Sequence, residues 1–399
     1  MGGAVGAMEG RPGTLIEPTQ PGYAVSTMNT PLRDLLGVEF PIAAFSHCRD
    51  VVAAVSKAGG FGVLGVTGLL PEQLKVELDW IEEQVGDRPY GVDILVPAKF
   101  VGSDKGGLET SKLEALMPEA HLRFVDALLQ EHGVPPLPED AWAPSPAVFE
   151  QERQRGLIEV AFEHRIRMVA NALGPPPDWM IERAHAEGVL VGALAGKAEH
   201  ARRHVEAGAD LVIAQGYEAG GHTGEIATMV LIPEVVDAIA PVPVLAAGGI
   251  GSGRQIAAAL ALGAEGVWTG SVWLATEEAE THPVVKEKFL AASSSDTIRS
   301  RSRTGKPARQ LRTDWTDAWE DPNNPDPLPM PLQQQLVGEA WQRIERTAHK
   351  SPGAKRLVNY FVGQVVGSMN DVQSVRSVVE QMVQEYVDTM ERLGGWSEE

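Results

Sequence analysis

One segment indicates the fold most clearly: Leu211-Val212-Ile213-Ala214-Gln215-Gly216-Tyr217-Glu218-Ala219-Gly220-Gly221-His222-Thr223-Gly224-Glu225. Its first residues form an apolar run that is typical of a buried strand, and the spacing of apolar residues over 226–240 predicts a helix. The order of elements is therefore strand, glycine-rich loop, helix.

The loop within this segment combines two adjacent glycines with a histidine. Gly220 and Gly221 allow the backbone to approach a flat ligand closely. His222 is the best-placed group in the chain for moving a proton near neutral pH. A proton-transfer group beside a planar ligand favours flavin chemistry. The alternative is that the glycines form only a tight turn and that His222 is a packed or surface histidine.

Short apolar runs alternate with helical patterns along the chain. The expected helices include 51–58, 178–186, 198–207 and 254–262. The expected strands are 41–45, 61–66, 90–96, 166–173, 190–195, 211–215, 242–247 and 266–274. This alternation predicts an α/β fold, a TIM (β/α)8 barrel of parallel strands, with a doubly wound sheet as the alternative.

Three segments fall outside the alternation. We expect 1–30, which is rich in Gly, Pro and Thr, to be a flexible arm ahead of a barrel over 31–320. The segment 98–163 is too long for a barrel connection, and its helical patches at 112–130 and 148–162 predict a helical insertion after the third strand that forms a lid or flank. Within 321–399, a proline-rich linker precedes amphipathic helices at 332–347 and 371–393, which should pack on the barrel or on a second copy in a homodimer.

Composition limits the partners of this chain. With 43% hydrophobic residues it can bury a large core, and its net charge of −20 opposes binding to nucleic acid or to an anionic membrane. The single cysteine, Cys48, excludes a disulfide framework and a cysteine-rich metal site. No secretory signal or membrane-spanning run is evident, so a cytoplasmic location is expected and no metal is predicted.

The ends of the last two expected strands predict a phosphate site. Gly248 and Gly249 follow the seventh strand, and Thr269-Gly270-Ser271 lies in the eighth. Loops after these strands commonly bind phosphate through backbone amides in a TIM barrel. The glycine spacing here matches neither a dinucleotide fingerprint nor a P-loop.

These motifs, together with Tyr90-Gly91-Val92-Asp93 at the third expected strand, resemble the nitronate monooxygenase (2-nitropropane dioxygenase-like) family over roughly residues 31–367. The resemblance implies an FMN-binding barrel in which His222 is the catalytic base. It places Gln215, Gly220 and Gly221 near the flavin ring. It also implies that the phosphate is held by Gly248, Gly249, Thr269, Gly270 and Ser271.

Two positions depart from the family pattern. Residues 44–49 replace the usual Gln-Ala-Pro-Met type of loop against the flavin, and Asp93 stands where Asn is common. A carboxylate beside the flavin would change its electronics, so we expect Asp93 to pair with a cation or to turn away. Lys197, after the fifth strand, is the candidate partner and could also stabilise the reduced flavin; the alternative is a surface lysine at the start of a helix.

Other polar residues have structural interpretations. His200 and His204 are predicted to lie on a solvated helix face rather than to bind a metal, and Glu225 is predicted to cap the following helix. Cys48 is interpreted as a small buried hydrophobe. A strip of cationic residues stands out in this acidic chain and comprises Arg299, Arg301, Arg303, Lys306, Arg309 and Arg312. This cationic strip either binds the phosphates of an acyl-CoA or NADPH, or pairs with the protein's own carboxylates.

Three functions remain open at this stage. The first is oxidation of alkyl nitronates or nitroalkanes, small-molecule substrates, with FMN and O2. The second is an FMN-dependent enoyl-thioester reductase acting on an acyl-carrier or CoA substrate, and the third is an NAD(P)H:quinone reductase.

Overall fold

The computed structural model describes residues 28–96, 113, 115–138 and 151–395. Eight parallel strands close into a barrel, which confirms the predicted TIM barrel and shows that the doubly wound alternative is wrong. The strands, in barrel order, are β1 (Ile42–Ser46), β2 (Phe61–Gly65), β3 (Tyr90–Ile94), β4 (Met168–Asn171), β5 (Leu190–Ala195), β6 (Leu211–Gln215), β8 (Val244–Ala247) and β9 (Gly266–Thr269).

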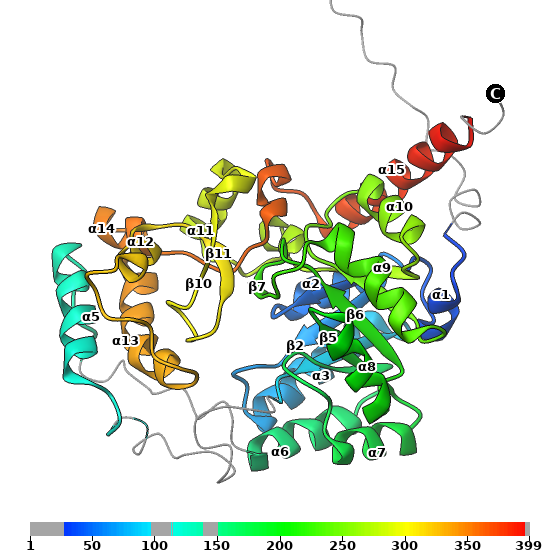
Figure 1. Ribbon diagram of the computed structural model, residues 1–399, viewed down its shortest axis with the longest axis horizontal. Helices are drawn as coiled ribbons and strands as arrows, with labels where there is room; N and C mark the ends of the chain where they lie inside the picture. The colour runs from blue at the N-terminus through cyan, green and yellow to red at the C-terminus, as the bar shows by residue number, and fades with distance from the viewer. Residues whose placement is uncertain (1–27, 97–112, 114, 139–150, 396–399) are drawn as a thin grey trace, which may run out of the picture.

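Helices surround the barrel and form a second group beside it (Figure 1). The first group is α1 (Pro31–Leu36), α2 (Arg49–Lys57), α3 (Pro71–Val85), α6 (Gln151–Phe162), α7 (Asp178–Ala186), α8 (Ala198–Ala207), α9 (Thr228–Ile239), α10 (Gly253–Ala261) and α15 (Val375–Gly395). The others are α5 (Glu119–Glu131), α11 (Pro283–Ala291), α12 (Asp314–Glu320), α13 (Leu332–Thr347) and α14 (Pro352–Leu357), with short 3-10 helices η2 (Ser271–Ala275), η3 (Ser294–Asp296) and η4 (Gln364–Ser368). None of the helices in these described ranges has the length and hydropathy needed to cross a membrane.

Every second strand residue fills the barrel interior. Phe61 and Ile213 are fully buried there, and the rings of Phe45 and Trp268 stack with centroids 6.2 Å apart near the carboxyl ends of their strands. Each fully buried side chain of this kind contributes roughly 1.5–3 kcal/mol to folding. The interior is therefore a packed core that supports ligand-binding loops above it.

The last helix, α15, packs on the barrel. Its apolar side chains Val375, Met382 and Tyr386 join the core formed with α2 and α10. The Glu385 carboxylate also accepts a 2.9 Å hydrogen bond from the amide of Gly253 at the start of α10. A carboxylate at a helix N-terminus is stabilised by the helix dipole. The apolar face of α15 therefore packs on the barrel. From the sequence, either the barrel or a second copy of the chain could have covered this face.

A second core lies beside the barrel mouth. The rings of Trp315 and Trp341 meet edge to face at 5.1 Å, and Trp319 and α5 pack around them. The two described helices of segment 98–163 lie apart, since α5 contacts α13 whereas α6 contacts α3 and β3. The role of this segment as a lid stays a prediction, and its proline-rich part at 139–150, like most of the predicted arm, lies outside the described residues.

A small antiparallel sheet joins the two cores, and the sequence did not predict it. Its strands are β7 (Gly221–His222), β10 (Thr297–Ser300) and β11 (Ala308–Leu311), in the order β10-β11-β7. In Figure 1 the β10–β11 hairpin lies between the barrel and the group of α5, α12 and α13. The predicted eighth strand, 266–274, is also too long, because the chain turns into η2 after Thr269.

The loop after β6 is packed tightly against a segment far along the chain. A Cβ atom at Gly220 would lie 2.8 Å from the amide nitrogen of Gly363, and the Gln364 amide donates to the Glu218 carbonyl at 2.9 Å. The glycine at 220 is therefore required by a backbone contact rather than by a ligand.

We expect Gly220→Ala to lower the free energy of unfolding by about 1–3 kcal/mol, because the new methyl group must displace the backbone at 362–363. Gly394→Ala is the matched control, since a Cβ there meets nothing within 4 Å. Urea unfolding of both variants measures the difference. Equal stability of the two would show that the contact at Gly363 yields without cost.

Candidate active site

The short strand β7 holds His222 at the barrel mouth. Pairing of His222 with Ala308 and of Gly221 with Arg309 docks the β10–β11 hairpin onto the loop after β6. The hairpin in turn places Thr304 against the imidazole, with 2.8 Å between His222 Nε2 and Thr304 Oγ1. The Thr304 hydroxyl lies 3.2 Å from the carbonyl oxygen of Lys306 and 3.3 Å from its amide nitrogen. The turn of the hairpin therefore holds the Thr304 hydroxyl in place against His222.

The protonation state of His222 follows from its surroundings. Burial, and to a smaller degree the positive charge of Lys306, lowers the pKa of His222 to about 4. Burial also lowers the pKa of the Lys306 ammonium. The imidazole is therefore neutral near pH 7 and able to accept a proton.

Backbone geometry leaves space at the residue that precedes this histidine, on the face of the small sheet opposite to the imidazole. Gly221 has φ 73°, a left-handed conformation that favours glycine, and a Cβ atom there would meet nothing within 4 Å. A side chain at this position would occupy the space in front of the loop. The predicted close approach of a ligand to Gly220 and Gly221 stays a prediction, and of the two only Gly221 has free space at its Cβ position.

The loops after β8 and β9 have the properties of an anion cradle. Gly248 and Gly249 have positive φ angles of 103° and 72°, and a Cβ at Gly270 would meet no atom closer than 4.0 Å. Within the described residues, the amides of Gly249, Ile250 and Gly270 have no hydrogen-bond acceptor. Amides of this kind at the carboxyl ends of barrel strands suit a phosphate.

The side chains of Thr269 and Ser271 are already engaged by protein. The Thr269 hydroxyl donates to the Ala43 carbonyl at 2.9 Å and accepts from the Trp273 indole at 3.0 Å. The Ser271 hydroxyl accepts from the Gly363 amide at 2.8 Å. If Thr269 and Ser271 contact the phosphate as predicted, they therefore do so mainly through their backbone groups and not through their hydroxyls.

Asp93 points into the upper barrel. It pairs in register with Ala170, an interior residue, and is only 3% exposed. Burial raises the pKa of Asp93 to about 8, so its carboxyl is mostly neutral near pH 7. Neither its carboxyl nor the Gln215 amide has a hydrogen-bond partner among the residues described, and both lie at the carboxyl ends of their strands.

The pairing expected between Asp93 and Lys197 is wrong. Lys197 is exposed where α8 begins, and no ion pair joins it to Asp93 in the described chain. The Asp93 carboxyl stays protonated instead of pairing with a cation, and this avoids the free-energy cost of burying a charge. A contact between Lys197 and the flavin stays a prediction.

Two minor interpretations are corrected and one is confirmed. His204 is buried and its Nε2 lies 3.0 Å from the Leu194 carbonyl, so it packs under the barrel helix rather than on a solvated face. Glu218 caps α9 through the amide and hydroxyl of Thr228, at 2.8 and 2.7 Å, whereas Glu225 is exposed. Cys48 is 7% exposed and packs in the core, as expected.

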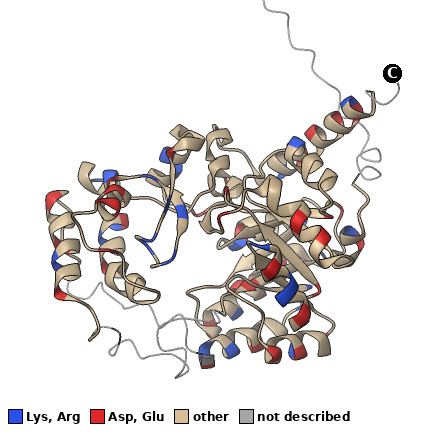
Figure 2. Cartoon of the chain, in the orientation of Figure 1, with Lys and Arg blue, Asp and Glu red and all other residues tan. Residues whose placement is uncertain are grey.

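The residues of the cationic strip fall into three groups by their partners, and Figure 2 shows Lys and Arg along the β10–β11 hairpin that carries most of them. Arg301 and Arg312 pair with Asp326 and Asp317, at 3.9 and 2.7 Å. Arg303 instead lies over the ring of Trp341, 3.6 Å from its centroid. Arg299, Lys306 and Arg309 form no ion pair with any carboxylate in the part of the chain that the structure describes, which leaves positive charge on both faces of the sheet that carries His222.

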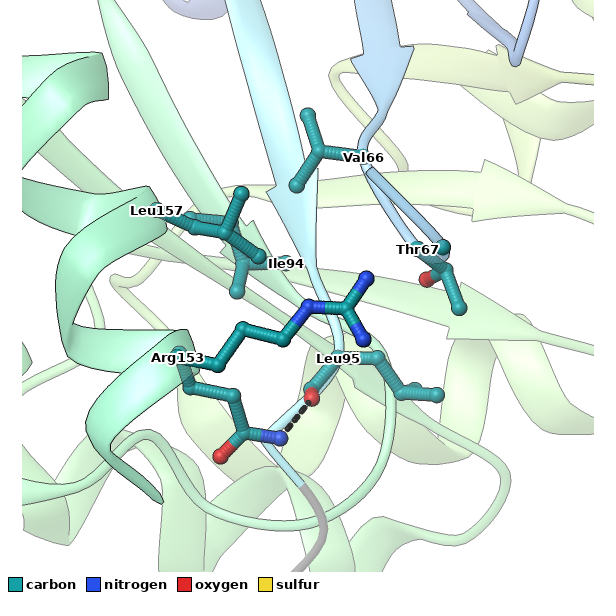
Figure 3. Close-up of a pocket in the computed structure, with 8 residues that line it drawn as sticks. Val66, Thr67, Ile94, Leu95, Arg153 and Leu157 are labelled. Atoms are coloured by element: carbon teal, nitrogen blue, oxygen red, sulfur yellow. Dashed lines mark hydrogen bonds between the residues drawn. The ribbon is translucent and has the colours of Figure 1, made fainter. Parts of the chain in front are cut away.

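A small side pocket opens beside the carboxyl ends of β2 and β3 (Figure 3). Helix α6 forms one wall of it through Arg153 and Leu157. The Arg153 guanidinium donates to the Leu69 carbonyl, and the Gln154 amide donates to the Leu95 carbonyl at 2.8 Å. Segment 98–163 thus contributes to the lining of a pocket at this end of the barrel.

Comparison with known proteins identifies the family. The nitronate monooxygenase family model matches residues 29–385, and the chain belongs to this family of oxidoreductases, whose enzymes depend on a flavin. A Mycobacterium tuberculosis protein named for a monooxygenase activity is 60% identical over 92% of this chain and 99% of its own length.

Two further similarities cover nearly the whole chain. A Rhodococcus jostii dehydrogenase, named for a carboxyl-CoA substrate with a bicyclic indene skeleton, is 28% identical over 93% of this chain and 99% of its own. The structure of a nitroalkane oxidase from Streptomyces ansochromogenes superposes with a TM-score of 0.75 at 25% identity, covering 91% of this chain and 99% of that one.

Two parts of the site were missed from the sequence. Thr304 lies 82 residues from His222 along the chain, so no local spacing connects them. Gly363 lies between the two predicted C-terminal helices, in a segment for which no role was predicted, yet its amide bonds Ser271 and its backbone contacts Gly220. The one available signal was the concentration of cations over 299–312 in an acidic chain.

Histidine-selective NMR should show that His222 titrates near pH 4, well below its ordinary value of 6.5. Lys306→Met should raise this pKa, because removal of a nearby positive charge makes protonation easier. Lys197→Met is the control, since Lys197 is exposed elsewhere at the mouth. A pKa near 6.5 in the wild type, or equal values in both variants, would contradict the assigned electrostatics.

Proposed function

We propose that this chain is an FMN-dependent oxidoreductase of the nitronate monooxygenase type, which oxidises nitroalkanes and alkyl nitronates with O2 as the final electron acceptor. The observation that carries the proposal is the neutral His222 imidazole, fixed by Thr304 at the barrel mouth. A nitroalkane must lose its α-proton before it can be oxidised, and this task requires a base at that position.

His222 accepts the α-proton in this proposal. The Thr304 hydroxyl donates to the Lys306 carbonyl and accepts from Nε2–H of His222, which leaves the Nδ1 lone pair as the basic atom. The step breaks the Cα–H bond, places the proton on Nδ1, and moves the electron pair onto the nitro group to give a nitronate. Thr304 fixes both the tautomer and the orientation of the ring.

Lys306 stabilises the charge that this step creates. Its ammonium acts on His222 electrostatically and has no carboxylate partner among the described residues. A positive charge near the nitro group favours the anionic product over the neutral substrate. The same charge adds to the larger effect of burial, which keeps His222 unprotonated before the reaction.

The residues at the mouth fit FMN. Gly248, Gly249 and Gly270 would hold its phosphate through backbone amides, and Asp93 and Gln215 present polar groups below the mouth where the ring would lie. The bound flavin supplies the two-electron acceptor that amino-acid side chains lack.

We expect the released chromophore to be FMN and not FAD, because one phosphate cradle lies after β8 and β9 and the sequence contains no dinucleotide-binding motif. Mass spectrometry of the supernatant from heat-denatured protein tests this. Adenine in that extract would show that FAD is bound.

His222→Asn should slow oxidation of a neutral nitroalkane by about 10²–10⁴-fold and affect its nitronate much less, because only the neutral form needs a base. Anaerobic flavin reduction with each substrate measures the two effects. Parallel losses with FMN still bound would indicate that His222 positions the ligand, and two unchanged rates would remove this loop from the catalytic centre.

A thioester reductase is the second candidate, with a quinone reductase as a related possibility that needs NAD(P)H. The observation in its favour is the set of cations without carboxylate partners beside His222, Arg299, Lys306 and Arg309, which suits a substrate or reductant carrying phosphates. NADPH consumption with an enoyl thioester, compared with oxygen uptake with a nitronate, separates the two functions.

A further inference from the structure

Two arginines lie directly opposite each other in the sheet that carries His222. Arg299 of β10 and Arg309 of β11 are register partners, so their side chains lie on the same face. His222 pairs with Ala308, one residue away, and therefore belongs to the other face. Like charges directly opposite each other destabilise a sheet unless an anion compensates for them.

The protein holds both guanidinium groups in place but does not neutralise them. Arg309 donates from Nε to the Tyr217 carbonyl at 3.1 Å and from Nη1 to Thr297 Oγ1 at 3.0 Å. Arg299 donates from Nη2 to the Thr223 carbonyl at 3.1 Å. Both groups lie over the Tyr217 ring, 4.4 Å and 5.1 Å from its centroid. All of these partners are uncharged.

Three hydrogen-bonding atoms in this cluster have no partner. They are Nε of Arg299, Nη2 of Arg309 and Oγ1 of Thr223, and each is buried. Arg309 itself is only 2% exposed. A buried donor without an acceptor costs about 1–3 kcal/mol, and more when the group is charged. Two such guanidinium groups over one aromatic ring, with the Thr223 hydroxyl on a residue that contacts Arg299, therefore indicate a place built for a ligand that accepts hydrogen bonds.

The cluster has an opening on the same face. Arg309 is the register partner of Gly221, where a Cβ atom would meet nothing within 4 Å. Arg299 is only partly buried, so its guanidinium borders that side of the sheet. A ligand group that enters past Gly221 would reach Arg299 and Arg309. Gly221 is the chain neighbour of His222, so this group would lie close to the proposed base.

We propose that Arg299, Arg309 and Thr223 form a binding site for a phosphate group of a substrate or co-substrate. Two guanidinium groups match the charge of a phosphate dianion, whereas a carboxylate would leave one of them uncompensated. In a chain with net charge −20, this local pair of cations is also what allows an anion to approach. Coenzyme A thioesters and NADPH both present such a phosphate.

This site is independent of the cradle after β8 and β9, which is assigned to the flavin phosphate. Binding of a phosphate-bearing ligand can also be measured without turnover. A failed binding experiment would therefore leave the proposed function of His222 standing, and loss of that function would leave the phosphate site standing.

The test is calorimetric titration of the FMN-loaded full chain with inorganic phosphate, coenzyme A and NADP⁺. Arg299→Gln removes one cation from a partly buried position, and Arg299→Lys keeps the charge but loses the planar fork. Arg312→Gln is the matched control, because Arg312 is exposed and pairs with Asp317 at 2.7 Å. Pantetheine lacks the 3′-phosphoadenosine diphosphate of coenzyme A, and NAD⁺ lacks the 2′-phosphate of NADP⁺, so the two comparisons identify which ligand's phosphates are recognised.

We expect Arg299→Gln to weaken binding of at least one phosphate probe by about 10- to 100-fold, with Arg299→Lys intermediate and Arg312→Gln unchanged. Preference for coenzyme A over pantetheine would identify a thioester substrate, and preference for NADP⁺ over NAD⁺ would identify the reductant. Equal affinity of wild type and Arg299→Gln for every probe, or no binding of any probe by wild type, would overturn the proposal. Melting temperatures and FMN content confirm that each variant is folded.

Discussion

The pairing of β7 with β11 is the constraint on which the site depends. Two residues of the loop after β6, Gly221 and His222, form ladder contacts with Arg309 and Ala308. This brings Thr304 within 2.8 Å of the imidazole although 82 residues separate them. Leu311 of β11 packs in the second core, which also contains Trp315. Packing in this core therefore controls the position of the hairpin and the geometry at the barrel mouth. A mutation that loosens that core should therefore affect activity as well as stability.

The neutral state of two buried groups is the second feature of the site. His222 is neutral because burial and Lys306 both oppose its protonation, and Asp93 is neutral because burial opposes its ionisation. An acidic protein thus places an uncharged base and an uncharged acid at the same end of the barrel. The positive charges near them, Lys306 on the tip of the hairpin and the pair Arg299 and Arg309, have no carboxylate neighbours in the described structure.

The barrel could be predicted from the sequence because each strand and helix carries its own apolar pattern, and because glycines mark the ends of α8 and of β8. The β10–β11 hairpin could not, since two strands of four residues, each with one arginine and joined by a cationic turn, resemble a polar loop. Capping of α9 by Glu218 rather than Glu225 depended on which carboxylate the folded loop directs at Thr228. The neutral Asp93 was missed for a related reason, because burial is a property of the closed barrel and not of the local sequence.

The most direct test of whether the docked hairpin positions His222 as the base is anaerobic flavin reduction in the Thr304→Val variant. The substrates are an α-deuterated and an unlabelled nitroalkane. The variant keeps the shape of Thr304 but removes the hydrogen bond to His222. We predict that reduction slows by about 10- to 100-fold, with a larger α-deuterium isotope effect, and that oxidation of the nitronate stays near the wild-type rate. Wild-type rates with both substrates, or an equal loss with both, would contradict the claim that the docked hairpin positions His222 as the base.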